Sequence, residues 1–170
     1  MSEKKTYAPE EIEELAAKAE KLARGHFRDG LNCGECVMLA YLELGVSDFP
    51  KETVALVSGM GGGIGFTHHM CGAVNAGVCA IGTRQGRKNP YEKETFEERV
   101  DQLHHDGTGI YPRHEAYVRD VVTEYGTMDC RDLCLPFDES TPEGKKARAK
   151  NCQQIIGFCA RKATEAALKE

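Results

Sequence analysis

Residues 59–81 read GMGGGIGFTHHMCGAVNAGVCAI, and this stretch decides the fold. Five of the seven residues from Gly59 to Gly65 are glycine, and the loop they form leads to Cys71. From Cys71 to Ile81 nearly all side chains are small, so the backbones of neighbouring helices can approach this segment closely. We therefore expect a central helix of small residues that is entered from a glycine-rich loop.

Outside this segment the apolar residues recur at helical spacing, and the alternation typical of strands is missing. Pro9 is a favoured first-turn residue, Asn32 and Glu35 are spaced as a capping box, and Gly45 is a stop signal. The pattern predicts an all-α fold, a compact helical bundle of about six to seven helices. The expected helices cover residues 9–25, 32–44, 48–59, 71–81, 96–103, 112–125 and the stretch from 141 onward.

Length and charge limit the class of protein. A chain of 170 residues suits a single domain, 1–170, in which the weakly patterned polar stretch 83–111 is an insertion or a lid. No apolar run has the length of a membrane span or the form of a secretion signal. The net charge of −5 disfavours nucleic acid as a partner. We expect a cytoplasmic protein that binds neither membranes nor nucleic acid.

The eight cysteines indicate metal or redox chemistry, because structural disulfides are rare in a reducing compartment. Four of them each follow a helix-capping residue or a glycine-rich loop, and we expect each to open a helix: Cys33, Cys71, Cys130 and Cys152. A helix N-terminus lowers the pKa of a thiol and stabilises the thiolate, which binds metals and attacks disulfides. These four cysteines are the candidate metal ligands.

The remaining cysteines are ranked by their surroundings. Cys36 completes a CxxC with Cys33, but a thioredoxin-like site requires a βαβ context that this sequence lacks. Cys159 lies on an apolar helix face and is expected in the core. Three cysteines form a second tier of ligands or redox thiols, namely Cys36, Cys79 and Cys134.

A glycine nest and a histidine complete the candidate site. The backbone amides of Gly61, Gly62, Gly63 and Gly65 can converge on an anion such as sulfide or thiolate, because glycine enters left-handed conformations at little cost. A tight turn between two closely packed helices explains the same glycines equally well. His69, two residues before the central helix, is a candidate ligand or proton relay.

The chain resembles the redox-active family named for its C-GCAxxG-C-C pattern. The residues that carry the resemblance are the loop 59–65, the run CGAVNAG at 71–77, CRDL from Cys130, and Cys152. It extends from Asn32 to the C-terminus, and the four family cysteines fall on the four selected above. The resemblance implies a small redox or metal-centre protein, common in anaerobic microbes and related to a domain found beside haem in split-Soret cytochromes. The four further cysteines and the polar stretch after Thr83 depart from the pattern.

Three functions follow as hypotheses. In the leading one, the four candidate ligands bind an iron–sulfur cluster for electron transfer with an unidentified redox partner. In the second, the chain is a metal-free thiol–disulfide oxidoreductase in which Cys33 attacks and Cys36 or another nearby cysteine resolves. In the third, zinc stabilises a helical module that binds another protein. The small-residue helix packs either within one subunit or across a homodimer.

Overall fold

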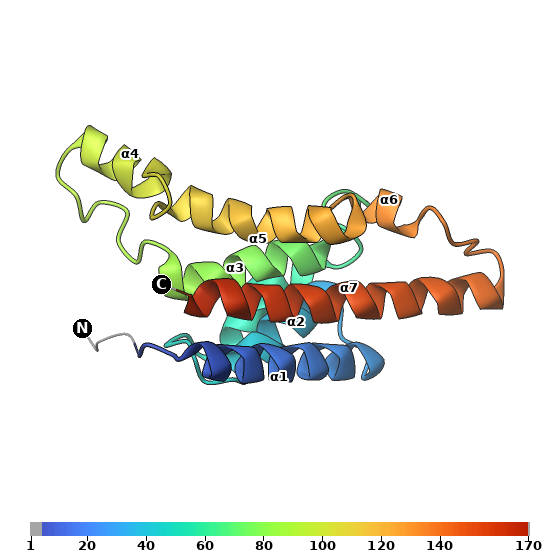
Figure 1. The fold of residues 1–170 in the computed structure, drawn as a ribbon. Helices are drawn as coiled ribbons and strands as arrows, with labels where there is room; N and C mark the ends of the chain where they lie inside the picture. The colour runs from blue at the N-terminus through green and yellow to red at the C-terminus, as the bar shows by residue number, and fades with distance from the viewer. Residues whose placement is uncertain (1–4, 170) are drawn as a thin grey trace.

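The computed structural model describes residues 5–169, and that part of the chain contains seven α-helices, one 3₁₀-helix and no strand. The all-α prediction is therefore confirmed. The elements are α1 (Pro9–Arg28), α2 (Cys33–Leu42), η1 (Lys51–Met60), α3 (Gly72–Gln85), α4 (Phe96–His104), α5 (Ile110–Tyr125), α6 (Cys130–Cys134) and α7 (Pro142–Leu168) (Figure 1).

Local sequence signals place most helix boundaries. Asn32 caps α2: its side chain accepts hydrogen bonds from the N–H groups of Gly34 and Glu35, and the Glu35 carboxylate accepts from the Asn32 N–H. Helix α7 begins at a proline that follows the Thr141 cap. Two expectations were inaccurate. Helix α1 continues through Gly25 to Arg28, and residues 51–60 form a 3₁₀-helix.

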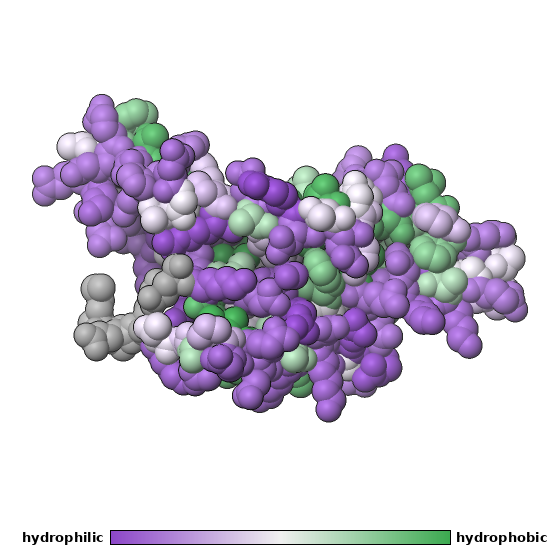
Figure 2. Space-filling view, in the orientation of Figure 1, coloured by the Kyte–Doolittle hydropathy of each residue, from purple (hydrophilic) through white to green (hydrophobic). Residues whose placement is uncertain are grey.

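The long helix α7 is the spine of the bundle. It packs against α1, α2, α3 and α5, and Figure 1 shows it running alongside α1, α3 and α5. Its C-terminal half is buried, whereas residues 142–150 project past the end of α1 with exposed or half-buried side chains. Polar residues cover most of the visible surface, and apolar ones gather around α6 (Figure 2). In the described residues, no helix is long and apolar enough to cross a membrane.

Small residues let α3 pack closely against α2, α5 and α7. Gly77 shows why: a Cβ atom added there would overlap the hydroxyl of Tyr117, which projects from α5 and is fully buried. Gly72 meets the backbone of Met60 and the sulfur of Cys33 in the same way. Both glycines of the CGAVNAG run therefore sit where another helix or loop leaves no room for a side chain.

The polar stretch 83–111 divides between three elements. Helix α3 extends through Gln85, and α5 begins at Ile110. The residues between them contain α4, which packs against α5 and stands out from the bundle at the end opposite α6 (Figure 1).

Candidate functional site

A cavity of about 200 Å³ lies where α2, the glycine-rich loop, α6 and α7 meet. Five of the eight cysteines line it, together with an arginine and mainly apolar side chains. We call it the cysteine cavity. Its lining residues are Phe27, Asn32, Cys33, Gly62, Phe66, Cys71, Cys130, Leu133, Cys134, Arg148, Cys152, Ile155 and Ile156.

Two chain segments run side by side and bring Cys71 and Cys130 to the cavity. The Cys71 N–H donates to the Met128 carbonyl at 2.9 Å, and the Cys130 N–H donates to the His69 carbonyl at 2.7 Å. Met70 and Asp129 form an antiparallel bridge between these bonds. The backbone thus fixes both cysteines, although they are far apart in the sequence.

Cys33 reaches the cavity from the first turn of α2. The Asn32 cap anchors that turn twice, because its Nδ2 also donates to the Ser58 carbonyl at 3.0 Å. The start of α3 lies against the Cys33 sulfur, which would be 2.8 Å from a Cβ atom added at Gly72. Cys33 and Cys71 are therefore neighbours across the α2–α3 contact.

The glycine-rich loop folds over this group. Positive φ angles occur at Gly62, Gly63 and Gly65 and also at Ile64, Phe66 and His68, where a side chain makes them costly. A Cβ atom at Gly63 would lie 2.8 Å from that of Cys130, which places the loop beside the cavity. In the predicted nest, the Gly65 N–H donates to the Gly59 carbonyl at 2.7 Å and is thus engaged within the loop. Anion binding by Gly61, Gly62 and Gly63 stays a prediction.

Cys134 and Cys152 approach each other between α6 and α7. The Asn151 Nδ2 donates to the Leu133 carbonyl at 3.2 Å, so the residues immediately before the two cysteines are joined. Cys152 lies well inside α7, and the expectation that it opens a helix was wrong. The helix start is at Pro142 because Thr141 supplies the cap; Asn151 instead ties α7 to α6.

Arg148 is the site residue that the sequence reasoning missed. Its guanidinium pairs with the Glu139 carboxylate, and Arg148 lines the cavity beside Cys134 and Cys152. Arg148 precedes Cys152 by four residues and so shares its helix face, which is the signal that could have revealed it.

Burial raises the thiol pKa values at this site. The pKa of Cys130 rises to about 12 and that of Cys152 to about 11, in both cases first through desolvation and then through the charge of Cys134. The pKa of Cys71 lies well above the ordinary value, although the Ala73 and Val74 amides at the start of α3 act in the opposite direction. The expectation that helix N-termini lower these three pKa values was wrong. Desolvation of the thiolate outweighs the helix dipole at Cys71 and Cys130, and Cys152 does not lie at a helix start.

The other candidates lie outside the cavity lining. The Cys36 thiol is buried and donates to the Leu31 carbonyl at 3.5 Å, and Cys79 is half-buried in α3. Cys159 is fully buried, as expected for a core residue. The His69 ring is 70% exposed and pairs with Asp129 at 3.8 Å, so its backbone carbonyl does more to build the site than its ring.

Two buried thiols make the free energy of unfolding depend on pH in the alkaline range. Burial raises the pKa values of Cys36 and Cys159 from 9.0 to about 12, so the unfolded chain loses these protons first as pH rises. We therefore expect the free energy of unfolding of the reduced, metal-free protein to fall as pH rises from 9 towards 12. Urea denaturation at successive pH values measures this. The Cys159→Ala variant should show a shallower fall, and an unchanged slope would contradict the assignment.

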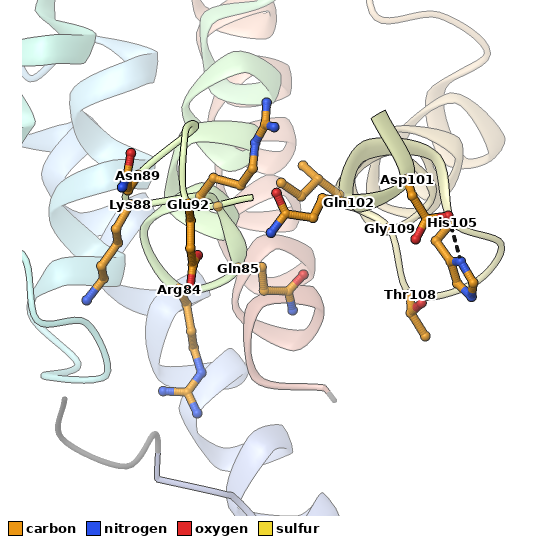
Figure 3. Close-up of a pocket in the computed structure, with 13 residues that line it drawn as sticks. Arg84, Gln85, Lys88, Asn89, Glu92, Asp101, Gln102, His105, Thr108 and Gly109 are labelled. Carbon is orange, nitrogen blue, oxygen red and sulfur yellow. Dashed lines mark hydrogen bonds and ion pairs between the residues drawn. The ribbon is translucent and has the colours of Figure 1, made fainter. Parts of the chain in front are cut away.

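A second, larger cleft of about 780 Å³ lies at the opposite end of the bundle (Figure 3). It contains no cysteine, and several of its polar groups are already engaged. Lys88 pairs with Asp48, His105 bonds Asp101, and the Gln85 Nε2 donates to carbonyl groups at the end of α7. This cleft joins the α4 region to the bundle, whereas the reactive groups gather in the cysteine cavity.

Fold and site together define an all-helical protein built around a cluster of thiols. The family model described as "Putative redox-active protein (C_GCAxxG_C_C)" matches residues 31–166. The chain belongs to this family of redox-active proteins. The search of curated proteins gives no match, and neither does the search of solved structures.

Proposed function

We propose that Cys33, Cys71, Cys130 and Cys152 bind an iron–sulfur cluster and that the protein transfers electrons through it. The observation that carries the proposal is that these four thiols, from four separate chain segments, line a single cavity. Four cysteine thiolates are the usual ligand set of such clusters. When bound, the cluster would supply one-electron redox chemistry, and a separate redox protein would exchange electrons with it.

The lining combines an apolar wall with five thiols and one cationic side chain. Leu133, Ile155 and Ile156 are buried and exclude water from the inner wall. Burial first, and then the charge of Cys134, raises the pKa values of Cys130 and Cys152. Four thiolates in such a setting would also repel one another. A cationic group between them would relieve this repulsion, and the Arg148 guanidinium contributes further positive charge.

We infer a cluster rather than a single zinc ion, because a cluster spans a larger space between its ligands. Within residues 5–169, no three His, Cys, Asp or Glu side chains are close enough to hold one metal ion. A tetrahedral zinc site brings its ligands to about 2.3 Å from one atom, whereas the ligands of a cluster surround a larger group. The CxxC dithiol hypothesis has less support, because the Cys36 sulfur bonds the Leu31 carbonyl and does not line the cavity.

The test is purification without oxygen, followed by an absorption spectrum and analysis of iron, zinc and acid-labile sulfide. We expect a broad band near roughly 400 nm with iron and sulfide in matching amounts. A colourless protein without iron would overturn the proposal. Zinc in place of iron would then favour the structural-metal hypothesis, and the absence of both would favour the dithiol hypothesis.

A further inference from the structure

Cys134 is the one thiol of the cysteine cavity that the proposed cluster does not use. It lines the cavity together with Cys130, Cys152 and Arg148. It lies close enough to the thiols of Cys130 and Cys152 for its charge to raise the pKa values of both.

Geometry selects the partner of Cys134. Residues four apart on a helix have Cβ atoms about 5–6 Å apart, whereas a disulfide requires about 3.5–4.5 Å. Cys130 and Cys134 are at this spacing in α6, so a bond between them would distort the helix. Cys152 approaches from α7 and is subject to no such limit, and the Asn151–Leu133 hydrogen bond holds the two helices together beside it.

We propose that Cys134 and Cys152 form a reversible disulfide by thiol–disulfide exchange with a small-molecule disulfide. The Cys134 thiolate attacks one sulfur of the reagent, whose S–S bond breaks and releases one thiolate. The Cys152 thiolate then attacks the Cys134 sulfur of this mixed disulfide and releases the second. The two cysteines lose two protons and two electrons, and the reagent gains them as two thiols.

The disulfide would also prevent cluster binding, a consequence that rests on the proposed function. Cys152 is a proposed cluster ligand, so the disulfide and the complete ligand set exclude each other. Oxidation by a small disulfide would therefore block cluster assembly, and reduction would restore it.

The test uses the full-length, reduced, metal-free chain treated with oxidised glutathione in the absence of oxygen. Free thiols are blocked, the chain is cut with trypsin, and the peptides are fragmented in a mass spectrometer. Cleavage after Arg131 separates Cys130 from Cys134, and fragmentation distinguishes Cys152 from Cys159. We expect one dominant protein disulfide, Cys134–Cys152, which dithiothreitol reverses. A different dominant pair, or none at any glutathione ratio, would overturn the proposal.

Variants test which cysteines form the disulfide. Cys134→Ser should abolish the disulfide, whereas Cys79→Ser, a matched change outside the cavity, should leave it intact. In reconstitution with iron and sulfide, prior glutathione oxidation should reduce uptake by the parent chain and not by Cys134→Ser. If the reduced parent takes up no iron, the cluster proposal fails while the disulfide assignment stands.

Discussion

The Gly72→Ala substitution is expected to lower the free energy of unfolding by about 3 kcal/mol, at the upper end of the usual cost of overpacking. The added Cβ would overlap the Met60 carbonyl oxygen and lie 2.8 Å from the Cys33 sulfur. The first contact is with backbone, which cannot rotate away. To make room, α3 must move away from η1 and from the first turn of α2, which brings Cys33 to the cavity.

Gly82→Ala provides the matched control because it makes the same change in the same helix. A Cβ at Gly82 would have its nearest neighbour at 4.0 Å, the His114 Nε2. Alanine is favoured over glycine in a helix by about 1 kcal/mol, so this variant should be as stable as the parent or more stable. Urea denaturation of both variants in the metal-free state measures the difference. Equal stability of the two variants would contradict the packing argument.

The Cys71→Ser substitution is expected to remove most of the iron and sulfide from protein prepared without oxygen, a loss of more than tenfold. Mutation of a residue that only supports a ligand typically costs tenfold to a hundredfold in metal affinity, and loss of a ligand costs more. The fold should persist, because Cys71 is the N-cap of α3 and serine is a favoured residue at that position.

Cys79→Ser tests whether the loss is specific. It replaces the other cysteine of α3, which is half-buried and outside the cavity lining, and it should retain iron and the absorption band. Circular dichroism of both variants should match the parent. Full iron content in Cys71→Ser, or equal loss in the two variants, would remove Cys71 from the ligand set.

Short-range signals made much of the fold predictable. Three helix starts could be predicted from the residues beside them. These residues are Pro9 for α1, the Asn32 capping box for α2 and the Thr141–Pro142 pair for α7. The motif also selected Cys33, Cys71, Cys130 and Cys152, and all four line one cavity. The errors arose where distant residues intervene. Asn151 resembles a cap in the sequence, but it bonds the Leu133 carbonyl of another helix.

The sequence by itself therefore determined the all-helical class, most helix starts and the four family cysteines, because these depend on local spacing. Only the tertiary structure decided which other groups join them. It placed Cys134 and Arg148 in the cavity and Cys36 outside it. It also reversed the expected direction of the thiol pKa shifts for Cys71, Cys130 and Cys152. The physical reason is that burial and contacts between distant segments set desolvation and hydrogen bonding, and these quantities exist only once α2, α3, α6 and α7 have packed together.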